Sequence, residues 1–367
     1  MEKKQIAILC GGRSSEHEIS LISAKNIVNA LDTEQFDAHI IAVSREGKWY
    51  YSQDHDWLPL EATGEPPKVE EHGEPVVIIP GPQEQKIALI NDVNKKITLH
   101  VIFPILHGTY GEDGTMQGLL EQLQVPYVGP DALSSAVCFD KDITKRILQH
   151  AGIPVAKQIL VQKNDPEPSA NDVFAELGNI VFVKPANAGS SIGVSKVTNE
   201  EEFKKALQLA FQFDKKILIE EGIEGREVEC AVLGNAQATP SEIGEIVTPD
   251  NFYSYRAKYL DENESELHAP ANLTNDEKVQ LQMMALEAYK ALGCEGLARI
   301  DMFLTNDGKI YVNEPNTLPG FTKISMYPKL WQETGIEYKD LITKLIQLAE
   351  ERFMTKMALK TDMPDEV

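Results

Sequence analysis

Apolar runs and polar turns alternate at the beginning of the chain in the order of an α/β fold. Residues 5–10 and 36–43 are short apolar runs, which are typical of strands buried in a parallel sheet. Two glycines interrupt the chain after the first run, and Ser14 and Ser15 can cap the helix that follows. This order of strand, turn, helix and strand predicts an open, mostly parallel sheet.

A polar segment follows, and after it come one more strand and a helical region. Residues 46–94 are rich in Pro and Gly, and short antiparallel strands are expected there at 76–79 and 86–90. Residues 97–104 form another apolar run, which predicts one more buried strand. From 131 to 150 the pattern is helical with a break near Asp140, where we place the first domain boundary.

The second half of the chain mixes strands and amphipathic helices, which indicates α+β architecture. Strands are expected at 155–161, 180–183, 194–197, 217–219, 227–232 and 242–247, and helices at 200–213, 275–292 and 338–354. Residues 248–268 are polar and structureless, as in a lid or a binding loop. We therefore expect three domains, at 1–138, 139–229 and 230–367.

A β-hairpin at 297–322 carries the residues with the clearest chemistry. Turn residues at 306–309 separate two strands, and if they form the loop, Asp301 lies opposite Glu314. The second strand should present on one face Ile310, Val312, Glu314 and Asn316. Asp301, Glu314 and Asn316 would then bring hard oxygen ligands together, as Mg²⁺ beside phosphates requires. Arg299 could meet the phosphate, although a solvated hairpin face would show the same pattern.

A second candidate site follows the strand at 180–183. Lys184 leaves the strand end, and the small residues at 186–194 let backbone N–H groups approach phosphate oxygens. The lysine precedes the glycines, so this is not a Walker A loop, and taken alone it could be only a flexible hairpin tip. The strand at 217–219 ends at Glu220, where the backbone could bind an adenine edge and Glu227 could reach ribose.

Glu16 and His107 both fall beyond the carboxyl ends of predicted strands, where open α/β sheets bind ligands. The turn CGGRSSEHE lacks the spacing of a dinucleotide-binding turn, so a cationic group near Glu16 fits better. A surface glutamate favoured by the helix dipole explains Glu16 equally well. His107, a lone histidine in a loop, is more often structural than catalytic. Lys141 follows the helical break and could point into a cleft.

The net charge, the cysteines and the N-terminus restrict the expected partners and the expected cellular compartment. The formal net charge of −22 over 367 residues argues against a nucleic-acid partner. The four cysteines have no metal-ligand spacing and are expected to be reduced core residues. The N-terminus is too polar for a signal peptide, and no apolar run approaches the roughly 18 residues of a membrane span. A cytoplasmic protein is therefore expected.

Taken together, these motifs resemble the D-alanine–D-alanine ligase family of the ATP-grasp superfamily. The resemblance rests on GGRSSEHEIS, HGTYGEDGTMQG, KPANAGSSIGVSK, AKYL, ARIDMF and NEPNTLPGFT, which occur in that order between residues 11 and 322. It implies a three-domain ATP-grasp fold and the ATP-dependent ligation of two D-alanines through an acyl phosphate, for peptidoglycan precursor synthesis. It also implies D-alanine and ATP as substrates, two Mg²⁺ that Mn²⁺ can replace, and a homodimer.

The resemblance also assigns roles to residues. The expected ATP-binding residues are Lys141, Lys184, Ser191, Glu220, Glu221, Ile223 and Glu227, and the expected metal ligands are Asp301, Glu314 and Asn316. The expected catalytic residues are Glu16, Ser190, Tyr259, Arg299, Gly320 and Ser325. The expected substrate contacts are Glu16, His107, Lys258, Arg299, Ser325 and Met326. In this scheme Ser190 bridges Glu16 and Tyr259, and Arg299 with the Gly320 N–H stabilises the oxyanion.

Three alternatives stay open at this point. One is a ligase of the same fold that makes a D-alanyl-D-lactate depsipeptide, and another is a different ATP-grasp carboxylate–amine ligase. In the resemblance, a tyrosine at position 259 accompanies dipeptide synthesis, whereas a histidine accompanies depsipeptide synthesis. The third alternative is a non-catalytic nucleotide-binding module, which would have no need of an oxyanion stabiliser such as Arg299.

Overall fold

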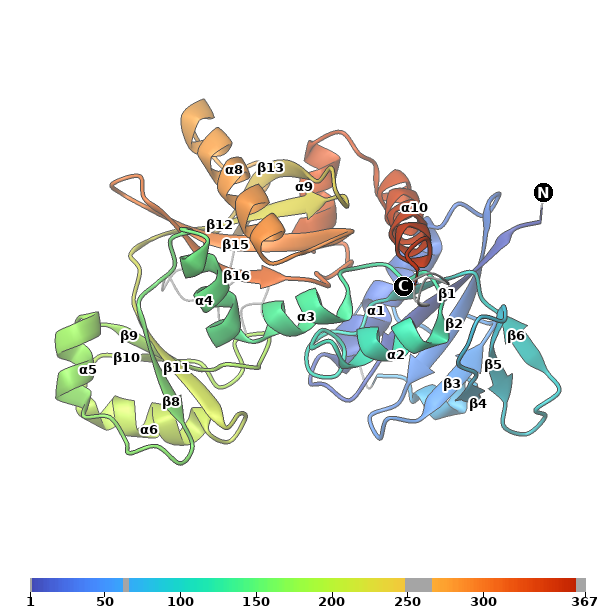
Figure 1. The fold of residues 1–367 in the computed structure, drawn as a ribbon, viewed down its shortest axis with the longest axis horizontal. Helices are drawn as coiled ribbons and strands as arrows, with labels where there is room; N and C mark the ends of the chain where they lie inside the picture. Colours follow the sequence, from blue (N-terminus) through green and yellow to red (C-terminus); the bar gives the residue numbers. More distant parts are fainter. Residues whose placement is uncertain (1, 62–65, 248–265, 361–367) are drawn as a thin grey trace, which may run out of the picture.

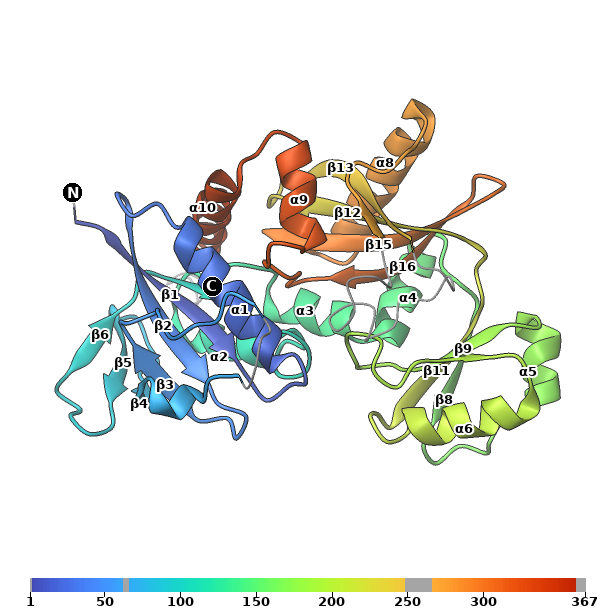
Figure 2. The same ribbon diagram turned by 180° about the vertical axis from the view of Figure 1, so that it is seen from behind.

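Three β-sheets with helices packed against them build the molecule (Figure 1). The computed structural model describes residues 2–61, 66–247 and 266–360. A seven-stranded sheet comes first in the chain, a four-stranded sheet second and a five-stranded sheet third. The same arrangement is seen from behind in Figure 2.

The first sheet is mixed, which corrects the expectation of a mostly parallel one. Its strand order is β6-β5-β4-β3-β2-β1-β7. The strands are β1 (Lys4–Gly11), β2 (Phe36–Val43), β3 (Trp49–Ser52), β4 (Glu74–Ile78), β5 (Gln85–Leu89), β6 (Lys96–Thr98) and β7 (Val101–Pro104). Only the pairs β1–β2 and β1–β7 are parallel. The other four pairs are antiparallel, because the segment between β2 and β7 extends the sheet as hairpins.

Two local expectations in this domain are wrong. The single strand expected at 97–104 is divided in two, since β6 pairs with β5 whereas β7 pairs with β1. Helix α1 (His17–Ala30) begins after Glu16 without a side-chain cap, and the Ser14 hydroxyl instead accepts a hydrogen bond from the Glu16 N–H. The first turn of α1 therefore begins later than the serines, and Glu16 stands at its N-terminus.

The four-stranded sheet has the order β10-β9-β11-β8 and is antiparallel throughout. Its elements are β8 (Gln158–Gln162), α5 (Ala170–Leu177), β9 (Val181–Pro185), β10 (Ser195–Val197), α6 (Glu200–Ala210) and β11 (Lys216–Glu221). The two helices and the sheet share one hydrophobic core. The expected return of the chain as strand β10 is confirmed, so residues 186–194 are the tip of a hairpin.

The five-stranded sheet has the order β14-β13-β12-β15-β16. Its elements are β12 (Gly225–Leu233), β13 (Thr239–Val247), β14 (Glu266–His268), α8 (Asn275–Ala291), β15 (Leu297–Thr305), β16 (Ile310–Asn316) and α9 (Met326–Glu333). Strand β12 belongs to this sheet along its whole length. The boundary placed between residues 229 and 230 therefore runs through the middle of a strand.

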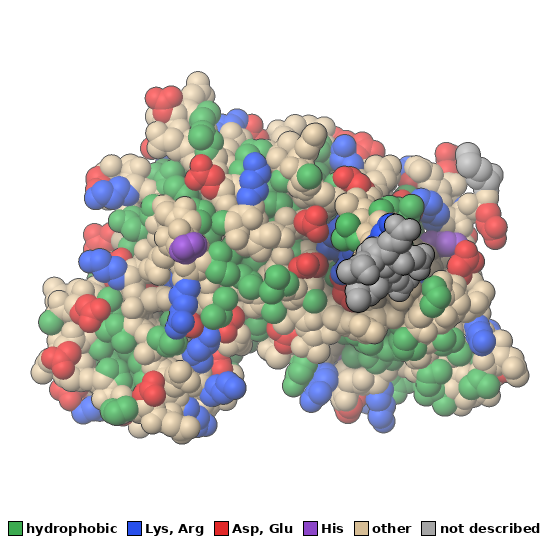
Figure 3. Space-filling model, viewed as in Figure 1, with side chains coloured by type: hydrophobic (Ala, Val, Ile, Leu, Met, Phe, Trp, Pro, Cys, Tyr) green, Lys and Arg blue, Asp and Glu red, His purple; other side chains and the backbone are tan. Residues whose placement is uncertain are grey.

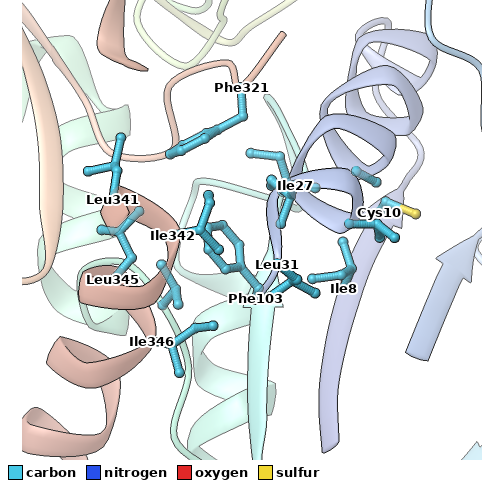
Figure 4. Packing of buried hydrophobic residues seen from close by; sticks show 14 of the residues in the cluster. Ile8, Cys10, Ile27, Leu31, Phe103, Phe321, Leu341, Ile342, Leu345 and Ile346 are labelled. Carbon is cyan, nitrogen blue, oxygen red and sulfur yellow. The ribbon is translucent and has the colours of Figure 1, made fainter. Parts of the chain in front are cut away.

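Helices join the three sheets. The connecting helices are α2 (Thr115–Leu123), α3 (Ala132–Phe139) and α4 (Lys141–His150), and the last helix is α10 (Tyr338–Met357). The expected break at Asp140 is confirmed, and Asp140 caps α4 through its side chain. Figure 4 shows α10 packing its apolar face, including Ile342 and Ile346, against α1 and Phe103 of β7. The C-terminal helix thus completes the core of the N-terminal sheet.

The cysteines and the helices agree with two simpler expectations. All four cysteines are free and buried. Cys138 and Cys294 lie with their sulfur atoms 3.6 Å apart. In the part of the chain that the structure describes, no helix combines the length and apolar character needed to cross a bilayer.

Acidic and basic side chains are interspersed over the face of the molecule in Figure 3. The same view shows a notch between the lobe of the four-stranded sheet and the N-terminal domain.

Candidate active site

The hairpin β15–β16 places Asp301 opposite Glu314, as expected, but it does so through a bulge. Near the turn the register pairs Leu304 with Ile310 and Met302 with Val312, and it shifts by one residue before Asp301 pairs with Glu314. A bulge of this kind reverses the facing of a strand. Because of the bulge, Ile310 and Val312 do not lie on the same face of β16 as Glu314 and Asn316.

Burial shows what the bulge accomplishes. Ile310 and Val312 pack in the core with Met302, whereas Glu314 and Asn316 face the same side as Asp301 and Arg299. The expectation that Ile310, Val312, Glu314 and Asn316 lie on one face is therefore wrong. In a regular strand all four side chains would lie on the same face. The extra residue lets the first half of β16 pack in the core while the second half faces Asp301 and Arg299.

Arg299 connects two carboxylates on neighbouring strands. Its guanidinium donates two hydrogen bonds of 2.7 Å to Asp301, one to each carboxylate oxygen. Its Nε also lies 3.2 Å from Oε2 of Glu229, a buried residue of β12 that pairs with Asp301 in the sheet. Glu229 was not predicted from the sequence, since its position inside an ordinary strand carries no motif.

Lys141 and Glu314 form another ion pair of the hairpin, with 3.0 Å between Nζ and Oε2. Lys141 is the first residue of α4. Its Nζ also donates a hydrogen bond to the carbonyl oxygen of Ala188, in the hairpin tip at residues 186–194, called the Gly/Ser hairpin below. One lysine thus contacts both the hairpin that carries the expected metal ligands and the loop expected to hold phosphate.

The donor set suits a hard divalent cation. Asp301 and Glu314 are paired across the sheet, and Asn316 pairs with Arg299 one step further along. The buried Oδ1 of Asn316 has no hydrogen-bond partner among the described residues. Two carboxylates and an amide oxygen are ligands that Mg²⁺ accepts. Within the described ranges, no three His, Cys, Asp or Glu side chains cluster in metal-binding geometry, so a three-donor site on this hairpin would need the amide oxygen of Asn316.

Glu220, at the end of β11, lies between two lysines. Its Oε2 is 2.6 Å from Nζ of Lys184, and its Oε1 is 2.6 Å from Nζ of Lys145. Burial acts to raise the pKa of Glu220, but the charges of both lysines outweigh burial and hold that pKa below its usual value. Lys145, on α4, was not predicted, because a lysine inside an amphipathic helix is usually solvated.

The Gly/Ser hairpin meets the start of α1. The Ser190 hydroxyl donates a hydrogen bond to Oε1 of Glu16, across 174 residues of chain. Ser190 and Ser191 have φ values of 51° and 56°, which are uncommon for residues with a side chain. Such conformations gather at ligand-binding loops. The structure therefore brings Glu16 and Ser190 together, as the sequence suggested.

Glycines leave room around the Glu16 carboxylate. A Cβ at Gly108 would lie 2.8 Å from Oε2 of Glu16, and one at Gly189 would lie 3.1 Å from it. His107, just before Gly108, is buried and donates from Nδ1 to the carbonyl oxygen of Leu318 at 3.0 Å. Its buried Nε2 has no hydrogen-bond partner in the described chain. Burial lowers the pKa of His107, which favours the neutral ring, whose Nε2 can accept a hydrogen bond.

Glu112 is a buried acid that the sequence interpretation missed. It accepts hydrogen bonds from the backbone N–H groups of Gly108 at 2.6 Å and Leu318 at 3.2 Å. Burial raises its pKa to about 8, and the charge of Glu16 acts in the same direction. Glu112 therefore ties the loop after β7 to the loop after β16, and the motif GEDG that contains it was the available signal.

The remaining expected residues differ in how much the structure shows of them. Gly320 packs so closely on Ser325 that a Cβ there would lie 2.7 Å from Oγ, and this Oγ accepts a hydrogen bond from the Thr322 N–H. The Met326 side chain is buried in the core, so only its backbone, in the first turn of α9, could face a ligand. Glu221 uses its Oε1 to accept a hydrogen bond from the Lys157 N–H, while Ile223 and Glu227 are half-buried next to it in the chain. Lys258 and Tyr259 lie outside the described residues.

Comparison with known proteins identifies the family. Models described as the D-ala D-ala ligase N-terminus and C-terminus match residues 5–130 and 147–347. The chain belongs to the D-alanine–D-alanine ligase family. It is 48% identical to the D-alanine–D-alanine ligase of Proteus mirabilis, over 98% of this chain and 99% of the relative.

Solved structures agree with this assignment and with the ATP-grasp fold of the family. A D-alanine–D-alanine ligase from Coxiella burnetii superposes with a TM-score of 0.86 at 37% identity, covering 97% of each chain. A D-Ala:D-Ser ligase from Enterococcus faecalis superposes with a TM-score of 0.82 at 36% identity, covering 95% of this chain and all of the other. Lys141 and Lys145 lie between the two segments that the family models match.

Proposed function

We propose that this protein ligates two D-alanine molecules to D-alanyl-D-alanine with conversion of ATP to ADP and phosphate. The observation that carries the proposal is the cluster of Arg299, Asp301, Glu314 and Lys141 on the bulged hairpin, in a chain of this family. Three anionic groups, namely ATP and two amino-acid carboxylates, must approach one another in such a reaction. A site rich in cations and metal ligands offsets their repulsion.

The first D-alanine is placed by the N-terminal domain. Glu16 would bind its ammonium group, and Nε2 of His107 would accept a further hydrogen bond from that ammonium. The buried position of Glu16, next to Ser190 and the glycines, supports a small zwitterionic ligand rather than a large one. The D-alanine carboxylate would then face the cationic residues of the hairpin.

The nucleotide is placed between the other two sheets. Lys141, Lys184 and the backbone of Ser191 would hold the phosphates, whereas Glu220, Glu221, Ile223 and Glu227 would contact adenosine. Asp301, Glu314 and Asn316 would hold two Mg²⁺, or Mn²⁺ in their place. Bound divalent metal would supply charge neutralisation for the transferred γ-phosphate.

The chemistry would proceed in two steps. The carboxylate of the first D-alanine attacks the γ-phosphate of ATP and becomes an acyl phosphate, with ADP as the leaving group. The amine of the second D-alanine then attacks the acyl carbon and expels phosphate. Arg299 and the Gly320 N–H would stabilise the oxyanion of the tetrahedral intermediate. Lys258, Ser325 and Met326 would hold the second carboxylate, and Tyr259 would join Ser190 and Glu16.

The setting follows from the product. D-alanyl-D-alanine is a building block of peptidoglycan, so we place the protein in the bacterial cytoplasm, where it acts on small molecules. The homodimer is part of the proposal because the family resemblance implies it. A second candidate product is a D-alanyl-D-serine dipeptide, because one similar solved structure is titled a D-Ala:D-Ser ligase. Tyr259 at the position that distinguishes dipeptide from depsipeptide synthesis favours an amine as the second nucleophile over D-lactate.

Phosphate release tests the activity, and separation of the products decides which dipeptide or depsipeptide is made. The enzyme is incubated with ATP, Mg²⁺ and D-alanine, alone and mixed with D-serine or D-lactate, and the products are separated by thin-layer chromatography. We expect D-alanyl-D-alanine as the main product at pH 7 in every mixture. A main product containing D-serine or D-lactate would overturn the choice of second substrate, and the absence of D-alanine-dependent phosphate release would overturn the activity itself.

A further inference from the structure

Lys145 is a charged residue in the interior that the proposed mechanism does not use. Its side chain is only 1% exposed, whereas those of Lys184 and Lys141 are 11% and 13% exposed. Lys145 is therefore further from solvent than the two lysines proposed to hold phosphate. Its described ionic contact is with Glu220, at 2.6 Å. Any effect of Lys145 on a ligand must therefore pass through the Glu220 carboxylate.

Helix α4 explains how the lysine reaches this position. Lys141 and Lys145 are one helical turn apart and so lie on the same face of α4. Lys141 contacts Glu314 of the hairpin, whereas Lys145 contacts Glu220 of β11. The cap that Asp140 provides sets the start of this helix. One helix face thus supports both the candidate metal site and the end of β11.

Burying this lysine is costly. Burial lowers the pKa of Lys145 to about 8, although the charge of Glu220 opposes that shift. An apolar side chain of similar length would avoid the cost, and buried ion pairs are often no more stabilising than such a replacement. Stability alone therefore gives little reason for a lysine at this place. Its effect on the carboxylate is the better reason.

The carboxylate of Glu220 has capacity left after binding both lysines. Each oxygen contacts one lysine, and an ionised carboxylate offers about four acceptor positions. Without Lys145, only Lys184 would oppose the effect of burial on the Glu220 carboxylate. With Lys145 present, the carboxylate is ionised and is held from both sides.

We propose that Lys145 is a positioning residue for nucleotide selection, which holds Glu220 ready to accept a hydrogen bond from the 6-amino group of adenine. The inference rests on the proposed function, in which Glu220 lies beside adenine. It goes further by assigning the choice of base to a lysine that no ligand contacts. A purine without the 6-amino group gains nothing from this arrangement.

The test compares two nucleotides in two proteins. ATP and purine riboside 5′-triphosphate, which lacks the 6-amino group, are titrated calorimetrically into the wild type and into Lys145→Met without D-alanine. A hydrogen bond to a charged group should make the wild type bind ATP roughly tenfold to hundredfold more tightly than the analogue. In Lys145→Met we expect this ratio to fall to within about threefold, and Lys145→Arg should restore part of it.

Lys86→Met is the matched control. Lys86 is also buried, but it donates to the carbonyl oxygens of Gly81, Leu123 and Gln124 in the N-terminal domain. Its loss removes a buried lysine without touching Glu220. We expect the Lys86→Met protein to be less stable than the wild type, with an unchanged preference for ATP over the analogue.

Two results would overturn the inference: an unchanged ratio in Lys145→Met, or an equal reduction in Lys86→Met. If Lys145→Met does not fold, Lys145→Gln answers the same question with a neutral polar side chain. Steady-state kinetics add a second reading, since the KM for ATP should rise while the KM for D-alanine stays the same. The titrations need no ligase turnover, so a protein that fails to join D-alanine but shows the expected ratios would refute the proposed activity and leave this inference standing.

Discussion

Two clusters of charged residues lie close together in this molecule and differ in their access to solvent. The hairpin cluster joins Arg299 to Asp301 and Lys141 to Glu314, and the Glu314 side chain is 29% exposed. The Glu220 cluster joins Lys145, Glu220 and Lys184, and the Glu220 side chain is 4% exposed.

Exposure decides what each cluster can do. Lys141–Glu314 is the most open ion pair of the hairpin cluster, whereas the Asp301 side chain is only 5% exposed. Ion pairs near solvent are weak and can exchange partners, so this pair can release its carboxylate to metal and its lysine to phosphate. Charges enclosed in protein are strongly coupled, and removing one leaves the others unpaired. The Glu220 cluster is therefore suited to fixing a geometry, and the hairpin cluster to binding and chemistry.

The largest effect should come from the hairpin cluster. Glu314→Gln removes a carboxylate from the expected metal site while leaving a side chain of the same size. We expect turnover to fall by roughly two or more orders of magnitude, because charge neutralisation by metal contributes several kcal/mol. Phosphate release measures this, and circular dichroism should show an unchanged fold. Asp307→Asn, in the exposed turn of the same hairpin, is the control that should keep wild-type activity, and near-normal turnover in Glu314→Gln would contradict the assignment.

The Glu220 cluster should respond in stability as well. Glu220→Ala leaves Lys145 and Lys184 without their shared carboxylate, and breaking a buried pair in this way typically costs about 3–5 kcal/mol. Urea denaturation should show this loss in the free energy of unfolding, whereas Glu314→Gln should change it by less than about 1 kcal/mol. Equal losses in the two variants would remove the distinction between the clusters.

Lys184 belongs to the Glu220 cluster but is also the expected phosphate contact. Lys184→Ala should weaken ATP binding roughly tenfold to hundredfold, since a charge-assisted hydrogen bond is lost, and should leave D-alanine binding nearly unchanged. Isothermal titration with each ligand measures both affinities. Unchanged affinity for ATP would show that Lys184 only supports Glu220.

The smallest effect concerns pH and the acid that joins the two loops. The pKa of Glu112 is raised from 4.5 to about 8, so the folded protein keeps a proton that the unfolded chain releases between those values. Its contribution to stability is greatest below pH 4.5 and is lost as the pH rises through about 8. The difference in Tm between the wild type and Glu112→Gln, measured from pH 5 to pH 8, should therefore shift steadily against the wild type. A constant difference would mean that Glu112 is ionised at pH 5.

The two clusters also differ in how far they could be predicted. The pairing of Asp301 with Glu314 was predicted from strand alternation with an assumed loop at 306–309. It is found because the bulge shifts the register by one residue after Met302 pairs with Val312. The bulge in β16 was missed, although its signal is present: Ile310 and Val312 are apolar, and the next buried residue is Pro315, out of phase with both. Lys145 carried no comparable signal, and Glu112 carried only the motif GEDG, since burial of a charge depends on distant parts of the chain.

The sequence by itself determined the strand, turn, helix and strand at the start of the chain, the hairpin that carries Asp301 and Glu314, and the family, because periodicity and motif spacing are local. Only the tertiary structure decided that the first sheet is mixed, that Glu112 joins the loops after β7 and β16, and that Lys145 contacts Glu220. Each of these depends on residues far apart in the chain, and the free energy of a buried charge is set by all the groups that surround it.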